Sequence, residues 1–122
     1  MKKILLIDDD ELVRDYIKAC LVDSGYEVID SGDGDSGIEM AVLEMPDLIL
    51  MDINMPGTNG YEAIGRLRDD QQTRELPIIA LTANNTSEDR DQAYEMGCKA
   101  YVAKPIVDTD ILREAVMRCL PD

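Results

Sequence analysis

The sequence predicts an α/β domain in which a parallel β-sheet is covered by helices on both faces. Short apolar runs alternate with longer segments whose apolar residues recur every three or four positions. The runs are apolar throughout, as strands buried on both faces are, and short loops between alternating strands and helices favour right-handed parallel crossovers. The 122 residues suffice for one core, so we expect a single domain over residues 1–122.

Two strand–helix pairs are expected in the first 45 residues or so. A strand at residues 3–8 precedes a helix at residues 10–24, which Gly25 ends. A strand at residues 27–30 precedes a helix that follows residues 32–35 and stops before Pro46. The apolar positions that support the two helices are Val13, Ile17, Cys20 and Leu21 in the first, and Ile38, Ala41, Val42 and Met45 in the second.

Three further pairs complete the chain. The expected strands are residues 48–52, 78–82 and 100–103, and the expected helices are residues 61–70, 87–96 and 108–120. Thr86 and Asp89 have the spacing of a helix-capping pair, and Gly97 ends the helix that follows. The positions expected to face the core in the last helix are Ile111, Leu112, Ala115, Val116 and Cys119.

Composition excludes several classes of function. A net charge of −14 argues against direct binding of nucleic acid or an anionic membrane surface. The chain has no long apolar stretch and no signal-peptide pattern, so we expect a cytoplasmic protein. With no histidine and no CxxC pair, zinc sites and Ser-His or Cys-His nucleophiles are excluded. Of the three cysteines, Cys98 is expected to be partly exposed.

Four predicted strands run into residues suited to chemistry. Residues 8–10 are three aspartates, and Asp52, Thr82 and Lys104 stand at the ends of the later strands. In open α/β sheets the ligand site lies outside the carboxyl ends of the strands. The sequence therefore gathers carboxylates, a hydroxyl and an ammonium at one edge, which favours metal-assisted phosphoryl chemistry.

The acids at these strand ends suit a magnesium ion. Asp8, Asp9 and Asp52 would repel one another if brought close, and Mg²⁺ takes oxygen ligands of this type. Asp10 fits a helix start better than the metal site. Lys104 is expected to reach Asp52 or a phosphoryl oxygen, and the following proline allows a cis peptide bond. Thr82 could donate its hydroxyl to a phosphoryl oxygen, or it could simply be a β-branched residue of the strand; spacing alone favours neither.

With these motifs in place, the chain resembles the receiver domain of response regulators in two-component signalling (CheY-like), of the stand-alone or hybrid-kinase type. The resemblance covers the whole chain and implies a flavodoxin-like three-layer sandwich with strand order 2-1-3-4-5. The motifs that carry it are Leu6-Ile7-Asp8-Asp9-Asp10, Leu50-Met51-Asp52-Ile53-Asn54-Met55-Pro56-Gly57 with Gly60, Ala80-Leu81-Thr82-Ala83 and Tyr101-Val102-Ala103-Lys104-Pro105.

The resemblance also implies the chemistry. Asp52 would accept a phosphoryl group from phosphohistidine on a sensor histidine kinase or a histidine phosphotransfer protein. Mg²⁺, for which Mn²⁺ could substitute, would be held by Asp8, Asp9, Asp52 and the backbone carbonyl of Asn54. Thr82 and Lys104 would bind the phosphoryl oxygens. The domain would not be a conventional enzyme, although it would catalyse its own phosphorylation and dephosphorylation.

Signal output would then change a protein–protein contact. Tyr101 would turn inward as Thr82 moves, and a downstream protein would dock on the face formed by residues 87–96, 100–103 and 108–120. No effector-like segment follows the last helix. Ile106 stands where Phe is frequent in the family, and the amides of Asn54 and Asn84 leave the lifetime of the phosphorylated state open.

Two alternatives come from other classes. The apolar run ending in residues 8–10 also fits a haloacid-dehalogenase-type phosphatase, with Asp8 as nucleophile and Asp10 as acid. That family's later acidic pair and cap insertion are missing. A flavodoxin-like binding module shares the fold class, but it needs a phosphate-binding loop where this chain has three acids.

Overall fold

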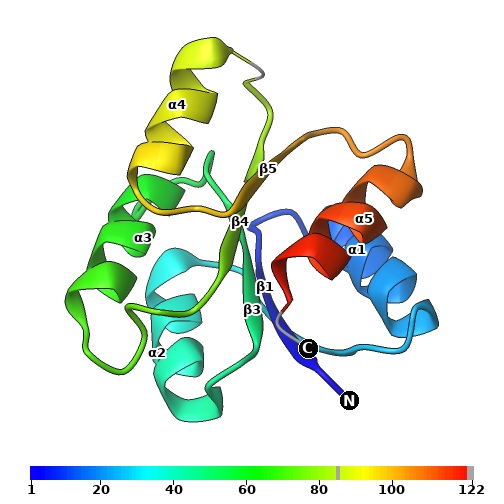
Figure 1. Cartoon of the computed structure of the whole chain (residues 1–122), viewed down its shortest axis with the longest axis horizontal. Helices are drawn as coiled ribbons and strands as arrows, with labels where there is room; N and C mark the ends of the chain where they lie inside the picture. The colour runs from blue at the N-terminus through cyan, green and yellow to red at the C-terminus, as the bar shows by residue number, and fades with distance from the viewer. Residues whose placement is uncertain (85, 121–122) are drawn as a thin grey trace.

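Five strands alternate with five helices over the described residues, 1–84 and 86–120, of the computed structural model (Figure 1). The strands are β1 (Lys3–Ile7), β2 (Glu27–Ser31), β3 (Leu48–Asp52), β4 (Ile78–Thr82) and β5 (Ala100–Ala103). The helices are α1 (Glu11–Asp23), α2 (Gly34–Glu44), α3 (Gly60–Asp69), α4 (Ser87–Glu95) and α5 (Thr109–Cys119). These bounds lie within a few residues of those predicted from the sequence.

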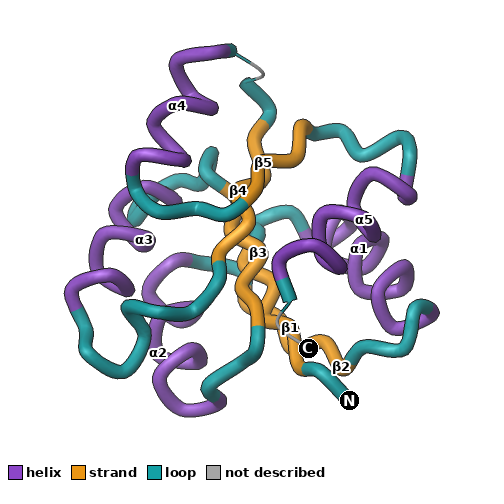
Figure 2. The backbone as a smooth tube through the Cα atoms, viewed as in Figure 1, coloured by secondary structure: helices purple, strands orange, loops and turns teal. Residues whose placement is uncertain are grey.

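The strands form one parallel sheet in the order β2-β1-β3-β4-β5 (Figure 2), which confirms the predicted fold class. Leu5 of β1 is level with Ile49 of β3, and Asp52 at the end of β3 is level with Leu81 of β4. The chain moves to one side from β1 to β2 and then to the other side through β3. This reversal opens a crevice between the carboxyl ends of β1 and β3.

Successive strand residues face two separate cores. Ile4 and Leu6 pack with the inner faces of α1 and α5, whereas Leu5 and Ile7 face the side covered by α2, α3 and α4. Figure 1 shows this division, with α1 and α5 on one side of the sheet and the other three helices opposite. Because β1 and β3 are buried on both faces, the polar residues at their ends have a rigid base.

Each helix begins with a side chain that accepts a hydrogen bond from the first helical turn. The five N-caps are Asp10, Asp33, Asn59, Thr86 and Asp108. A cap of this kind typically stabilises a helix by about 1 kcal/mol. The caps also fix where each loop after a strand gives way to a helix, and so they define the rim of the crevice.

The structure corrects three predictions about exposure. Met45 and Ile111, predicted to face the core, are 48% and 56% exposed. Met45 follows the last turn of α2 in a left-handed conformation, and Ile111 lies at the edge of a stripe led by Leu112. Cys98, predicted to be partly exposed, is buried in the second core, where burial raises its pKa to about 11.

Two further features complete the description. The Lys104–Pro105 peptide bond is cis. Among the described residues, none of the helices combines the length and the apolar character needed to span a bilayer.

Candidate functional site

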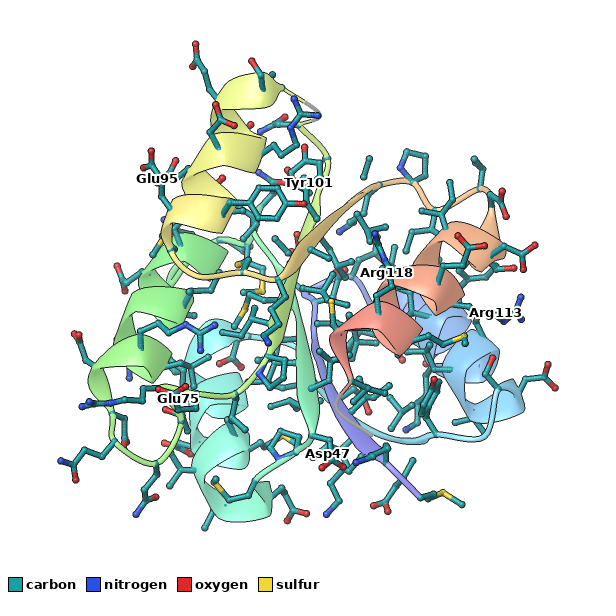
Figure 3. All side chains as sticks on the ribbon, in the orientation of Figure 1. Asp47, Glu75, Glu95, Tyr101, Arg113 and Arg118 are labelled. Carbon is teal, nitrogen blue, oxygen red and sulfur yellow. The ribbon has the colours of Figure 1, made fainter. Side chains whose placement is uncertain are left out.

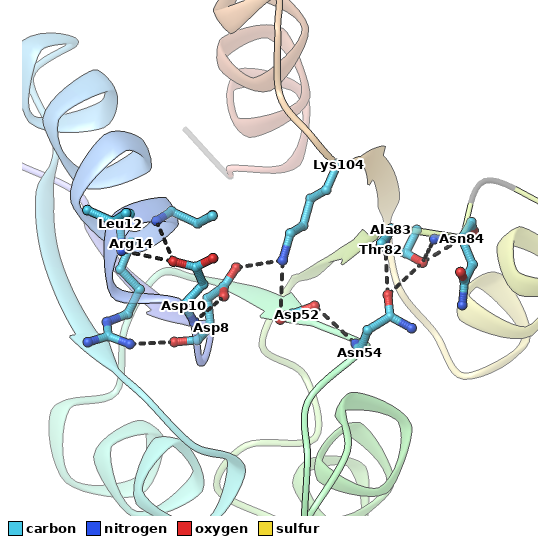
Figure 4. Close-up of polar contacts among 11 residues, drawn as sticks. Asp8, Asp10, Leu12, Arg14, Asp52, Asn54, Thr82, Ala83, Asn84 and Lys104 are labelled. Atoms are coloured by element: carbon cyan, nitrogen blue, oxygen red, sulfur yellow. Dashed lines mark hydrogen bonds and ion pairs between the residues drawn. The ribbon is translucent and has the colours of Figure 1, made fainter.

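The ends of β1 and β3 make the same local turn. The Oδ1 atom of Asp8 accepts a hydrogen bond of 2.9 Å from the Asp10 N–H, and Oδ1 of Asp52 accepts one of 3.0 Å from the Asn54 N–H. An aspartate that binds the N–H two residues later in this way folds the chain into a tight turn. Both turns fix one carboxylate oxygen and leave the other, Oδ2, directed into the crevice between the strands (Figure 4).

Three carboxylates meet there. One oxygen from each of Asp8, Asp9 and Asp52 lies within 4.8 Å of the others. Asp8 and Asp52 are buried and Asp9 is exposed, so the cluster opens to solvent on one side. The Oδ2 atom of Asp52 is buried and has no hydrogen-bond partner among the described residues. An all-oxygen donor set with an unsatisfied buried oxygen fits a hard divalent cation with access from solvent.

Among the residues that the structure describes, Lys104 pairs with this cluster. The Nζ atom of Lys104 donates a hydrogen bond of 3.0 Å to Oδ2 of Asp8. It also lies 3.3 Å from Oδ2 of Asp52, which is close enough for an ion pair. The atoms are not aligned for a hydrogen bond. A single ammonium therefore interacts with two buried carboxylates at once and cannot neutralise the three acids by itself.

The charges shift the pKa values of both partners. Burial and the neighbouring Asp8 raise the pKa of Asp52 to about 6, against the opposing effects of the Asn54 N–H and Lys104. Burial works to lower the pKa of Lys104, but the two carboxylates outweigh it and the pKa is raised. Near neutral pH the site thus holds an ionised carboxylate that is poorly solvated, next to a lysine that stays charged.

Asp10 lies outside this cluster. Its Oδ1 accepts hydrogen bonds from the N–H groups of Leu12 and Val13, at 3.0 and 3.3 Å, and so caps α1. This confirms the prediction that Asp10 is a helix-start residue. The residue that the phosphatase alternative would use as its acid is thus engaged in capping α1.

Thr82 completes the crevice at the end of β4, where its side chain is buried. Its hydroxyl lies 3.2 Å from both Oδ1 of Asn54 and the carbonyl oxygen of Asn84, either of which can accept its proton. It also accepts a hydrogen bond of 3.0 Å from the Asn84 N–H. The Thr82 hydroxyl is therefore engaged with the rim of the crevice and not with Asp52.

Comparison with known proteins assigns the family. The sequence profile of the response regulator receiver domain matches residues 4–117. The chain belongs to the receiver domain family. Receiver domains are signalling domains of two-component systems and not conventional enzymes, and neither the phosphatase nor the flavodoxin-like alternative is favoured.

Relatives of known function and structure agree with this assignment. The polar-differentiation response regulator DivK of Brucella ovis is 37% identical over 105 residues, which cover 86% of this chain and 85% of DivK. The chemotaxis protein CheY4 of Vibrio cholerae has a TM-score of 0.92 at 30% identity, covering 98% of this chain and 99% of CheY4.

A third relative bears on the metal. The receiver domain of the sensor histidine kinase PA1611 from Pseudomonas aeruginosa has a TM-score of 0.87 at 35% identity, covering 97% of this chain and 96% of the other. That structure holds a magnesium ion in its active-site cleft.

Tyr101, the residue expected to report the state of this receiver domain, lies beside the segment between β4 and α4 (Figure 3). Its hydroxyl donates a hydrogen bond of 2.7 Å to the carbonyl oxygen of Asn84. The same carbonyl lies within reach of the Thr82 hydroxyl. Tyr101 and Thr82 thus contact the same peptide group, so a movement of that peptide changes the surroundings of both.

Three contacts that shape the site were not predicted from the sequence. Arg14 of α1 donates a 2.7 Å hydrogen bond to the carbonyl oxygen of Asp8 and pairs with Asp30, which braces the end of β1. A Cβ added to Gly60 would overlap the backbone of Asp52 and Ile53, so α3 begins directly against the end of β3. The third is the side chain of Asn54. Its amide was expected to bear on the lifetime of the phosphorylated state, but its contacts with Thr82 and Ala83 were not predicted. The sequence held one local signal for the shape of these loops. Aspartate favours the turn in which its side chain binds the N–H two residues later.

Proposed function

We propose that this receiver domain is a phosphoacceptor switch in which Asp52 takes a phosphoryl group from phosphohistidine on a sensor histidine kinase or a histidine phosphotransfer protein. The observation that carries the proposal is the state of the Asp52 carboxylate. It is buried, one oxygen is fixed by the Asn54 N–H, and the other has an ion-pair partner but no hydrogen bond. A carboxylate in that environment is oriented and poorly solvated, which favours nucleophilic attack.

Magnesium would complete the site. Asp8, Asp9 and Asp52, with the backbone carbonyl of Asn54, would hold Mg²⁺, and Mn²⁺ would substitute for it. When bound, the ion would neutralise charge on the phosphoryl oxygens during transfer. Three acids and one lysine give the cluster too much negative charge to admit a phosphoryl group otherwise.

The residues of the chain would then act as follows. An oxygen of Asp52 forms a bond to phosphorus while the bond from phosphorus to the imidazole nitrogen breaks, and the electron pair of that bond stays on the imidazole. Lys104 would bind one phosphoryl oxygen by turning its ammonium from Asp52. Thr82 would donate its hydroxyl to another. Positioning and charge compensation of this kind supply most of the catalysis in phosphoryl transfer.

Docking of the partner is supported by a groove next to Lys104. It has a volume of about 480 Å³ and runs between α1 and the loop after β5. Leu12, Tyr16 and Val107 line it and are 80%, 48% and 88% exposed. An exposed apolar groove beside a buried nucleophile suits a partner that must bring its own phosphohistidine to that nucleophile.

Output would use the surface of α4, β5 and α5. Phosphorylation replaces a carboxylate by a group of about −1.5 to −2 charges, which would draw Thr82 and the segment that leads into α4 towards Asp52. Ile111, with 56% of its surface exposed, and Tyr94, with 48%, lie on α5 and α4 and offer apolar contacts to a downstream protein.

The central test is chemical phosphorylation. Incubation with Mg²⁺ and acetyl phosphate or phosphoramidate should add one phosphoryl group by intact mass, and Asp52→Asn should abolish it. Asp8→Asn should weaken labelling by weakening the metal site, whereas in a phosphatase with Asp8 as nucleophile it would abolish labelling and Asp52→Asn would not. Labelling that persists in Asp52→Asn would contradict the proposal.

The docking groove has a matched test. Leu12→Gln should slow transfer from a phosphorylated kinase or phosphotransfer protein while labelling by acetyl phosphate is unchanged. Leu43→Gln is the control, because Leu43 is also 80% exposed but lies on α2, away from the groove. Equal rates of protein-to-protein transfer for the two variants would contradict docking at the groove.

A further inference from the structure

The side chain of Asn54 connects the phosphoacceptor loop to the segment that follows β4. Its Oδ1 atom accepts a hydrogen bond of 2.9 Å from the Ala83 N–H and lies 3.2 Å from the Thr82 hydroxyl (Figure 4). Its own N–H donates to Oδ1 of Asp52. One residue is therefore bonded through its main chain to the phosphoacceptor and through its side chain to the end of β4.

The two donors that Asn54 holds stand at the place from which a group on Asp52 would be bound. Asp52 is level with Leu81 in the sheet, so Thr82 and Ala83 come directly beyond it on the neighbouring strand. A hydroxyl has a single proton. While Thr82 donates to Asn54 or to the Asn84 carbonyl, it cannot donate to an oxygen on Asp52.

We infer that the Asn54 side chain is a positioning residue that holds the Thr82 hydroxyl and the Ala83 N–H in the unphosphorylated arrangement, so that these donors must exchange the Asn54 oxygen for a phosphoryl oxygen when Asp52 is modified. The inference rests on the proposed function. It adds that the Asn54 side-chain oxygen competes with the phosphoryl oxygens for these two donors. Phosphoryl oxygens carry charge and accept stronger hydrogen bonds than an amide oxygen, which gives the exchange its direction.

The same exchange would couple the site to the output surface. Thr82 accepts a hydrogen bond from the Asn84 N–H, and Tyr101 donates one to the Asn84 carbonyl. Thr86, two residues further on, caps α4. Release of Asn54 therefore frees Thr82 and Ala83, which lie next to the Asn84 peptide that Tyr101 contacts.

The experiment measures binding of a phosphoryl analogue at equilibrium. Beryllofluoride is titrated with Mg²⁺ present, and the species bound to Asp52 is followed by ¹⁹F NMR in wild type, Asn54→Ala and Asn84→Ala. Asn54→Ala removes the acceptor of the Ala83 N–H and one of the two acceptors of the Thr82 hydroxyl, so it should tighten binding by about fivefold. Asn84→Ala is the matched control, because the contacts described for Asn84 come from its main chain.

Two readouts separate this role from a purely structural one. The gain from Asn54→Ala should shrink in a Thr82→Ala background, because one of the two released donors is then missing. In the protein without beryllofluoride, hydrogen exchange of the Ala83 amide should be faster in Asn54→Ala than in wild type.

The outcomes are distinct. Tighter binding in Asn54→Ala, with none in Asn84→Ala, supports the inference. Binding that is unchanged or weaker in Asn54→Ala, or tightened equally in both variants, overturns it and leaves the proposed function intact. Failure of wild type to bind beryllofluoride at Asp52 would instead overturn the proposed function itself.

Discussion

Replacement of Asp52, the proposed phosphoacceptor, should make this protein more stable in the absence of metal. Asp52→Asn removes a buried negative charge that lies beside Asp8 and has an unsatisfied oxygen. The amide keeps an oxygen to accept the hydrogen bond from the Asn54 N–H. The variant therefore loses the repulsion and most of the desolvation while keeping the turn after β3.

The size of the effect follows from the shifted pKa. Burial and Asp8 raise the pKa of Asp52 from its ordinary value of 3.8 to about 6, so the folded state binds this proton more than a hundredfold more tightly than the unfolded state. At about 1.4 kcal/mol per factor of ten, ionising Asp52 reduces the free energy of unfolding by about 3 kcal/mol. Loss of the Lys104 ion pair offsets part of this gain, so we expect about 2 kcal/mol in favour of Asp52→Asn above pH 6.

The sign of the pH dependence is set by the raised pKa. The contribution of the protonated carboxyl is fully present below pH 3.8 and is lost as pH rises through about 6. In wild type this carboxyl therefore lowers stability as pH rises from about 4 to 6. The advantage of Asp52→Asn should be absent near pH 4 and complete by pH 7.

Urea unfolding followed by far-ultraviolet circular dichroism provides the assay, with EDTA present at pH 4, 5, 6 and 7.5. A second series with Mg²⁺ should reduce or reverse the difference at pH 7.5, because the ion compensates the same charges in wild type. If wild type without metal is as stable as Asp52→Asn at pH 7.5, or more stable, the buried charge of Asp52 does not destabilise the fold and the reasoning is refuted.

Three further substitutions test separate parts of the site. Lys104→Met should destabilise the metal-free protein by about 3 kcal/mol at pH 7.5, because it leaves two buried carboxylates without a cation, and Mg²⁺ should recover part of the loss in a urea titration. Gly60→Ala should lower the free energy of unfolding by about 2 kcal/mol and reduce labelling by acetyl phosphate, because the added Cβ meets the backbone of Asp52 and Ile53. A variant with wild-type stability would show that the fold does not require this close approach. Asp10→Ala should cost about 1 kcal/mol through loss of the α1 cap while Mg²⁺ affinity, measured by calorimetry, changes less than twofold; a large loss of affinity would return Asp10 to the metal site.

Much of this site could be predicted because its residues stand at the carboxyl ends of buried strands. Apolar runs identify the buried strands, and parallel strands in an α/β sheet place the residues that follow them on one edge. Asp8, Asp52 and Thr82 were found in this way, since each is the first polar side chain after a buried run. Lys104 follows the edge strand β5, and its long side chain reaches the carboxylates across the neighbouring strand.

What could not be predicted depends on the direction of individual side chains, in a helix for Ile111 and in a loop for Asn54. Ile111 has the apolar character of its neighbours, but the helix turns it to the edge of the buried stripe, and periodicity does not resolve that difference. Asn54 was recognisable as a turn residue, yet its choice of Thr82 and Ala83 as partners depends on the distance between two loops that are 28 or 29 residues apart in sequence. Such distances arise only once the sheet is assembled.

The features that would make Asp52 reactive in the proposed function are the ones that make it destabilising. A solvated carboxylate would be more stable and a poorer nucleophile, and a carboxylate fully neutralised by lysines would leave no place for a metal ion. The fold accepts the cluster because β1 and β3 are buried on both faces and their turns are fixed by the N–H groups of Asp10 and Asn54. An ion that binds the folded state alone increases stability in proportion to the logarithm of its concentration, so occupancy of the proposed magnesium site and stability should rise together. A metal titration that raised phosphorylation without raising the free energy of unfolding would separate the two and show that the acids are not where the ion acts.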